Sequence, residues 1–143
     1  MKPIILAAAA AAALAAASAA AEERKLVSVV TTPEPQTQLM AMVLTMQAVQ
    51  QGAKAHVLLC GPGGDLALRD APASATAPQP PRDMSPQGLM GKIMEAGAIV
   101  EVCAIYLPGK GAGPEALIDG VGVAQPPAMA GAMMDPETRV WSF

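Results

Sequence analysis

The sequence predicts a three-layer α/β/α sandwich, an α/β fold with a mostly parallel sheet of about five strands. Short runs of β-branched and apolar residues, typical of strands buried on both faces, alternate with segments of helical periodicity. Strands joined by right-handed helical crossovers lie parallel and carry helices on both faces of the sheet. The 143 residues are enough for one such domain.

The first 21 residues are predicted to be a secretory signal peptide, which leaves residues 22–143 as a single domain. One early lysine, a long apolar run and small residues precede Glu22, as in export signals. The alternative is a membrane anchor, but the apolar run over residues 3–17 is shorter than the roughly 20 residues that a bilayer core requires. We therefore expect a periplasmic or secreted protein, with no membrane attachment after cleavage.

The first half of the domain is predicted to contain two strands and the helix between them. Residues 25–31 (KLVSVVT) and 54–60 (KAHVLLC) are β-branched and apolar, as in buried strands. Over residues 36–51, apolar side chains recur every three or four positions, which indicates one buried helix face. We expect Thr37 to cap this helix and Gly52 to end it.

The second half is predicted to contain shorter elements. Residues 69–84 are rich in proline and follow neither a strand nor a helix period, which indicates a surface excursion. Ser85 and Pro86 are typical of a helix start. We expect a helical turn at 65–68, a helix from Pro86 to about residue 96, a strand at 98–104, a short helix at 114–118, a brief strand at 121–123, a short helix at 127–134 and a last strand at 138–143.

Thr31, Cys60 and Cys103 stand at the carboxyl ends of predicted strands. Binding and chemistry gather at this edge of a parallel sheet, and an exported protein can form disulfides. If the first strand lies between the other two, the cysteines are about 10 Å apart, beyond the roughly 7 Å limit for a disulfide. If the second and third strands are neighbours, a bridge is feasible. We favour the arrangement without an intrachain disulfide.

Composition and motifs exclude several classes of function. With 9 basic and 12 acidic residues and a net charge of −3, the chain has no surface suited to a phosphate backbone. Only three aromatic residues are present, too few for stacking on bases. The hydrolase, phosphate-loop and zinc-protease motifs are absent from the sequence. We expect no nucleic acid and no enzyme of these classes.

A metal site is the less favoured interpretation of the histidine and the methionines. His56 and Cys60 share one face of a strand, and ten methionines would suit copper(I). However, His56 lies in the middle of its strand, and pairs such as Met42 and Met46 follow a helical spacing, as core residues do. We expect no metal and no cofactor.

The segment 97–103 (GAIVEVC), followed by Lys110 and Gly111, resembles the DsrE family of small sulfur-relay proteins, which includes the TusD-type subunits. The Gly-rich turn after Cys60 (CGPGGD) adds to the resemblance, which covers roughly residues 25–143. It implies a three-layer α/β fold, assembly into trimers or hexamers, and a persulfide carried on Cys103. Lys110 and Gly111 match the family's second basic position and its glycine, whereas Gly109 departs from the first basic position.

The resemblance implies that Cys103 accepts sulfur from a donor protein and passes it to an acceptor, as in a sulfurtransferase-like carrier. A thiolate is the nucleophile, and a nearby cation such as Lys110 lowers the pKa of a thiol. The alternative is that Cys103 is a small buried hydrophobic residue at a strand end. Export is a further departure, because the family's relay partners are cytosolic.

Cys60 is a second candidate thiol, either resolving Cys103 or packing in the core. The glycines of its turn form a candidate anion-binding loop, because successive backbone N–H groups make a nest for anions. This loop comprises Gly61, Gly63, Gly64 and, by the resemblance, Gly111. The competing function is a non-enzymatic, homo-oligomeric binding module for a small anion or a partner protein at the strand-end crevice, with Met129, Met133 and Met134 at its oligomer interface.

Overall fold

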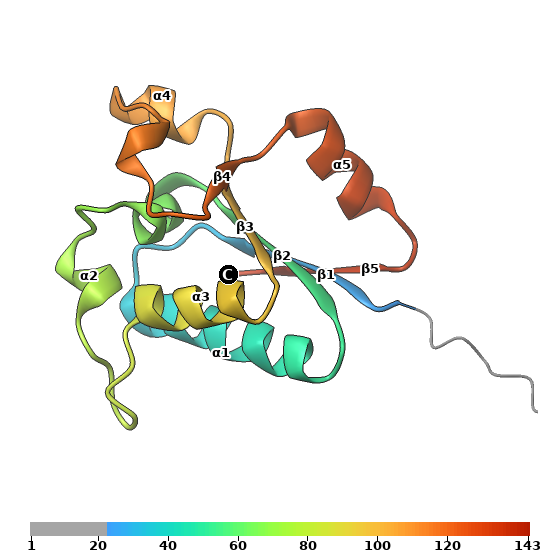
Figure 1. Cartoon of the computed structure of the whole chain (residues 1–143), viewed down its shortest axis with the longest axis horizontal. Coiled ribbons are helices and arrows are strands. Elements are labelled where there is room, and N and C mark those ends of the chain that lie inside the picture. The colour runs from blue at the N-terminus through green and yellow to red at the C-terminus, as the bar shows by residue number, and fades with distance from the viewer. Residues whose placement is uncertain (1–22) are drawn as a thin grey trace, which may run out of the picture.

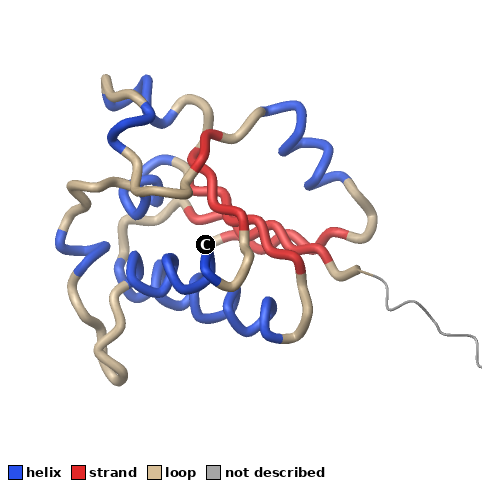
Figure 2. Tube along the Cα trace, in the orientation of Figure 1, coloured by secondary structure: helices blue, strands red, loops and turns tan. Residues whose placement is uncertain are grey.

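The computed structural model describes residues 23–143, so the signal peptide predicted for residues 1–21 lies outside the described residues. Five strands form one parallel sheet in the order β4-β3-β2-β1-β5. The strands are β1 (Lys25–Val30), β2 (Lys54–Leu59), β3 (Ile99–Val102), β4 (Gly122–Val123) and β5 (Thr138–Ser142). Figure 2 shows this sheet, in red, crossing the middle of the molecule.

Helices cover both faces of this sheet, which confirms the predicted α/β/α sandwich. The main helices α1 (Pro35–Gln50) and α3 (Pro86–Glu95) lie on one face, and α5 (Pro126–Met134) lies on the other (Figure 1). Shorter elements are the 3-10 helices η1 (Gly61–Ala67) and η2 (Pro114–Ala116) and the helices α2 (Ala73–Thr76) and α4 (Tyr106–Lys110). Within residues 23–143, the helices are too short or too polar to cross a bilayer.

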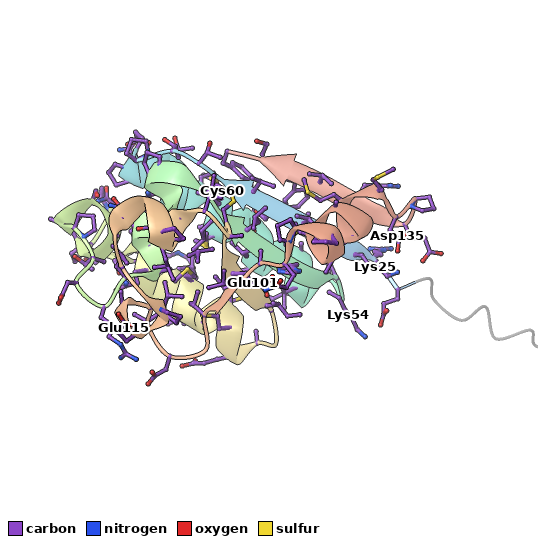
Figure 3. All side chains as sticks on the ribbon, turned by 90° about the horizontal axis from the view of Figure 1, so that it is seen from above. Lys25, Lys54, Cys60, Glu101, Glu115 and Asp135 are labelled. Atoms are coloured by element: carbon purple, nitrogen blue, oxygen red, sulfur yellow. A yellow bond between two sulfur atoms is a disulfide. The ribbon has the colours of Figure 1, made fainter. Side chains whose placement is uncertain are left out.

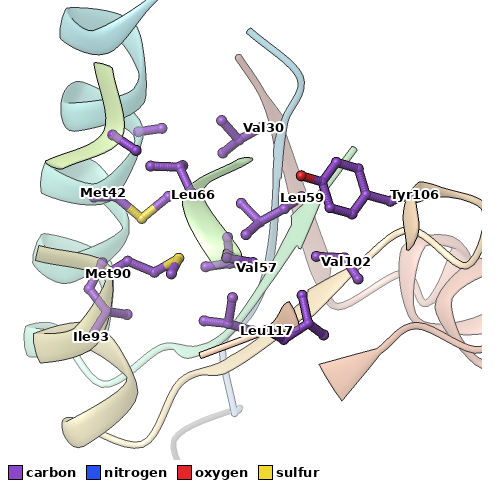
Figure 4. Close-up of a cluster of buried hydrophobic side chains, with 14 of the residues drawn as sticks. Val30, Met42, Val57, Leu59, Leu66, Met90, Ile93, Val102, Tyr106 and Leu117 are labelled. Carbon is purple, nitrogen blue, oxygen red and sulfur yellow. The ribbon is translucent and has the colours of Figure 1, made fainter. Parts of the chain in front are cut away.

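The main core lies between the sheet and the α1–α3 layer. Strand residues such as Leu59 and Val102 pack there against Met42, Met90 and Ile93, all of them fully buried (Figure 4). Two of these five side chains are methionines, in a chain with few aromatic residues. A smaller cluster lies under α5 and comprises Val27, Leu58, Ala124 and Met129.

Helix α1 begins one residue earlier than the helical spacing indicated, and the expected cap at Thr37 is wrong. Pro35 occupies the first turn, where its missing N–H costs no hydrogen bond. Glu34 is therefore the cap, and its carboxylate accepts hydrogen bonds from the backbone N–H of Gln36 at 3.0 Å and of Thr37 at 2.6 Å. These bonds, with one from the Thr37 hydroxyl, hold the pKa of Glu34 below its ordinary value.

The cap predicts a pH-dependent contribution to stability. Because the pKa of Glu34 is lowered in the folded state, its contribution is present above the ordinary pKa of glutamate and is lost as the pH falls through the folded value. Glu34→Gln should therefore lower the urea midpoint at neutral pH and change it little in strong acid. Glu95→Gln, at the exposed end of α3, is the matched control and should not lower the midpoint. An equal loss for Glu34→Gln at both pH values would contradict this assignment.

The proline-rich segment 69–84 is more structured than its sequence indicated. It contains α2, whose Ala75 is buried in the main core. Gln79 and Met84 exchange two backbone hydrogen bonds, at 3.0 and 3.3 Å. A helix of four residues with one buried side chain has no recognisable periodicity, so the sequence pattern could not indicate it.

Candidate functional site

The two cysteines meet at the carboxyl edge of the sheet. Strands β2 and β3 are neighbours, and Leu59 pairs with Val102, so the residues that follow are aligned side by side. The Cys103 N–H donates to the Leu59 carbonyl at 2.8 Å. A disulfide joins Cys60 and Cys103, whose Cα atoms are 5.1 Å apart. The expectation of no intrachain disulfide is therefore wrong, because β2 and not β1 is the central strand of the three.

The disulfide lies on the α5 side of the sheet and is only partly buried. Both cysteines are half-buried and pack against the smaller cluster, which includes Leu58, Ala124 and Met129. Cys103 also contacts the main core. Figure 3 shows Cys60 toward one end of the strands, away from Lys25. The two cysteines thus lie at the border between the core and the solvent.

The loops that follow the two cysteines are tied together by one carboxylate. Asp65 lies in η1, which follows Cys60, and Tyr106 and Lys110 lie in α4, which follows Cys103. The Tyr106 hydroxyl donates to Asp65 Oδ1 at 2.6 Å, and Lys110 Nζ lies 2.6 Å from the same oxygen. Burial, and then the bond to Asp65, raise the pKa of Tyr106, so the phenol stays protonated and keeps donating.

Lys110 therefore lies beside the site, in contact with Asp65 and Tyr106. Its ammonium sits over the Tyr106 ring, 5.6 Å from the ring centre, in a cation–π contact. It links the two cysteine loops through Asp65, and its support of a Cys103 thiolate stays a prediction. Asp65 and Tyr106 were not singled out from the sequence. In the sequence, each of them follows a cysteine by a few residues. This position indicates a contact between Asp65 and Tyr106 only once the two cysteines are known to be neighbours.

Two glycines of the candidate anion loop are needed for close packing. Gly63 and Gly64 are buried. A Cβ on Gly63 would overlap the Val30 carbonyl, and a Cβ on Gly64 would overlap the Tyr106 ring. The Gly63 N–H donates to the Cys60 carbonyl at 3.1 Å. These glycines let η1 lie directly against the end of the sheet.

The other two glycines of that loop lie at exposed turns. Gly61 and Gly111 adopt left-handed backbone angles, with φ of 51° and 65°, which favour glycine. Gly111 ends α4, and its N–H donates to the Pro108 carbonyl at 3.1 Å. Anion binding by the four glycines stays a prediction.

His56 lies on the same side of the sheet as the disulfide but has a partner of its own. Its Nε2 lies 2.8 Å from Glu101 Oε2, and both side chains are half-buried. Between residues 23 and 143, no three histidine, cysteine or acidic side chains converge in a way that suits a metal ion.

Two cavities lie elsewhere on the molecule. One, of about 580 Å³, is at the amino ends of the strands and is lined by Lys25, Lys54 and Asp135 among others. There the 2.8 Å hydrogen bond between Lys25 and Asp135 raises the pKa of the lysine and lowers that of the carboxyl (Figure 3). The other, of about 710 Å³, lies between α1 and the proline-rich segment. Neither is lined by Cys60 or Cys103.

Comparison with known proteins shows the fold. No family model and no curated protein matches this sequence. The structure is similar to the crystal structure of the ychN protein from E. coli, with a TM-score of 0.66 and 15% sequence identity over 85% of this chain and 99% of that chain. It is also similar to MTH1491, a protein of unknown function from Methanobacterium thermoautotrophicum, with a TM-score of 0.62 and 12% identity over 85% and 100% of the two chains. Both have the DsrE-like fold, and this chain shares it.

Proposed function

We propose that this protein is a DsrE-like thiol protein that accepts sulfane sulfur as a persulfide on Cys103. The observation that carries the proposal is the half-buried cysteine pair at the carboxyl edge of a parallel sheet, where such folds place their chemistry. The DsrE-like fold of the two structural neighbours supports the same class of activity.

The transfer begins once the disulfide is reduced. The Cys103 thiolate attacks the outer sulfur of a donor persulfide, R–S–SH. A bond forms between the Cys103 sulfur and that outer sulfur, the donor S–S bond breaks, and the donor leaves as the thiolate R–S⁻. Cys103 then carries the persulfide, and charge and atoms balance without any other reactant. An acceptor thiolate removes the outer sulfur by the same type of step.

The Asp65–Tyr106–Lys110 contacts support this chemistry by positioning. They hold the loop after Cys60 against the helix after Cys103, so the two sulfur atoms remain close when the disulfide opens. Lys110 is about half exposed and adds a positive charge beside the edge, where a persulfide anion would form.

The proposal includes a sulfur donor or acceptor protein as partner and assembly of several copies. Helix α5 supports the assembly, because it is apolar throughout and leaves Met134 84% exposed. It also includes export, which would place the site in the periplasm or outside the cell, where disulfides persist.

Intact mass spectrometry tests the proposal. Protein reduced and then freed of reductant without air is mixed with one equivalent of glutathione persulfide. Cys60→Ser, in which Cys103 is the only thiol, should gain the mass of one sulfur atom. Cys103→Ser should gain none, and it is the matched control because it differs by the same atom exchange at the other end of the bridge. If folded Cys60→Ser gains no mass, the carrier role is wrong and the binding module is favoured.

A further inference from the structure

We infer that Cys60 resolves the persulfide on Cys103, so that the protein reduces sulfane sulfur to sulfide and ends each cycle as the disulfide. This inference rests on the proposed function, and it names the fate of the sulfur and the second reactant, a dithiol reductant. A carrier with one thiol must hand its sulfur on, whereas a site with two adjacent thiols can release it.

The arrangement of the strands makes this step geometrically simple. Cys60 and Cys103 follow directly in register on neighbouring parallel strands, and their side chains lie on the same side of the sheet. Their Cα separation of 5.1 Å is within the range that a disulfide spans without backbone movement. The Cys60 N–H is fixed to the Val30 carbonyl at 3.0 Å, and the Cys103 N–H to the Leu59 carbonyl at 2.8 Å. Both attachment points are therefore set by the sheet.

The surroundings keep the second thiol in place when the bridge is open. The Asp65 carboxylate holds Tyr106 and Lys110 from the loop beyond Cys103, so the loop beyond Cys60 does not move away. Buried Gly63 lies against the Val30 carbonyl and hydrogen-bonds the Cys60 carbonyl. A nucleophile held in this way reacts as part of one molecule, much faster than a thiol from solution.

The step balances with the groups that are present. The Cys60 thiolate attacks the inner sulfur of Cys103–S–SH, a bond forms between the two cysteine sulfurs, and hydrosulfide leaves with the electron pair of the broken S–S bond. The sulfane sulfur gains two electrons and the two thiols lose them. Hydrogen sulfide is a stronger acid than an alkyl thiol, so hydrosulfide is a better leaving group than a cysteine thiolate. A dithiol then reduces Cys60–Cys103 and restores both thiols.

The test measures sulfide and protein mass together. Reduced wild type, free of reductant, receives one equivalent of glutathione persulfide under argon. It should release about one sulfide per chain and end lighter than the reduced protein by two hydrogen atoms, as the disulfide. Cys60→Ser should keep the added sulfur and release sulfide at least about tenfold more slowly. Reduction of the spent wild type with dithiothreitol, followed by its removal, should restore a second equal release.

The outcomes separate this inference from the proposed function. If wild type and Cys60→Ser both keep the added sulfur, or both release sulfide at the same rate, Cys60 does not resolve the persulfide, although Cys103 still carries it. If Cys60→Ser gains no sulfur and wild type releases no sulfide, the proposed function itself fails. Cys60→Ala provides a second variant, and a cooperative urea transition for each variant establishes that it is folded.

Discussion

Reduction of the Cys60–Cys103 disulfide is expected to lower the free energy of unfolding by about 4 kcal/mol. The bridge joins residues 43 positions apart, and the chain-entropy relation for a loop of this size gives about that value. Because each cysteine directly follows a strand whose pairing does not depend on the bridge, the reduced protein should keep the same fold. The urea midpoint, measured with and without reductant, gives the difference directly.

The double variant Cys60→Ala/Cys103→Ala is the control for this result. It should have the lower urea midpoint in both conditions and should not respond to reductant. If the wild-type midpoint is the same with and without reductant, the bridge is either not formed or of no consequence for stability. The proposed stabilisation of the fold by the Cys60–Cys103 disulfide would then be wrong.

Gly63→Ala is expected to be the most damaging single methyl addition in the loops around the site. The new Cβ would overlap the Val30 carbonyl, a backbone group at the carboxyl end of β1, so η1 must shift away from the strands. Overpacking of this kind costs about 1–3 kcal/mol, occasionally more. The shift should also loosen the hydrogen bond between the Gly63 N–H and the Cys60 carbonyl, and so slow sulfide release.

Gly91→Ala is the matched control, because the same methyl group meets no atom there. Gly91 lies within α3 with no neighbour near the added Cβ, so the substitution should stabilise the protein by about 0.5–1 kcal/mol through helix propensity. Urea unfolding of both variants measures the two changes in stability. A Gly63→Ala variant that is as stable as wild type would show that η1 does not lie against the sheet end as described.

Local sequence patterns predicted the strands but not their order. The runs at residues 25–31, 54–60 and 98–104 are apolar on both faces, and such runs form buried strands whatever their neighbours are. Which strand is central depends on how the helices pack over the whole sheet. Any order of these three strands buries the same side chains, so the sequence pattern alone could not place Cys60 beside Cys103.

The side-chain contacts around the cysteines were harder to predict from the sequence than the order of the strands. Helix α4 has five residues and contains Pro108 and Gly109, so no helical period is visible there. The bonds from Tyr106 and Lys110 to Asp65 join residues more than forty positions apart. They follow from the pairing of β2 with β3, which brings the two loops together. The cap at Glu34 was missed for a different reason, because glutamate is not among the residues usually found at that position.

The central claim is that Cys103 becomes a reachable, sulfur-accepting thiol once the disulfide opens. The mass of reduced, folded Cys60→Ser after one equivalent of glutathione persulfide tests it most directly. We predict that nearly every molecule of Cys60→Ser gains one sulfur atom, and that reductant removes this sulfur. An unchanged mass, in a protein whose Cys103 is alkylated fully after unfolding in urea, would contradict the claim.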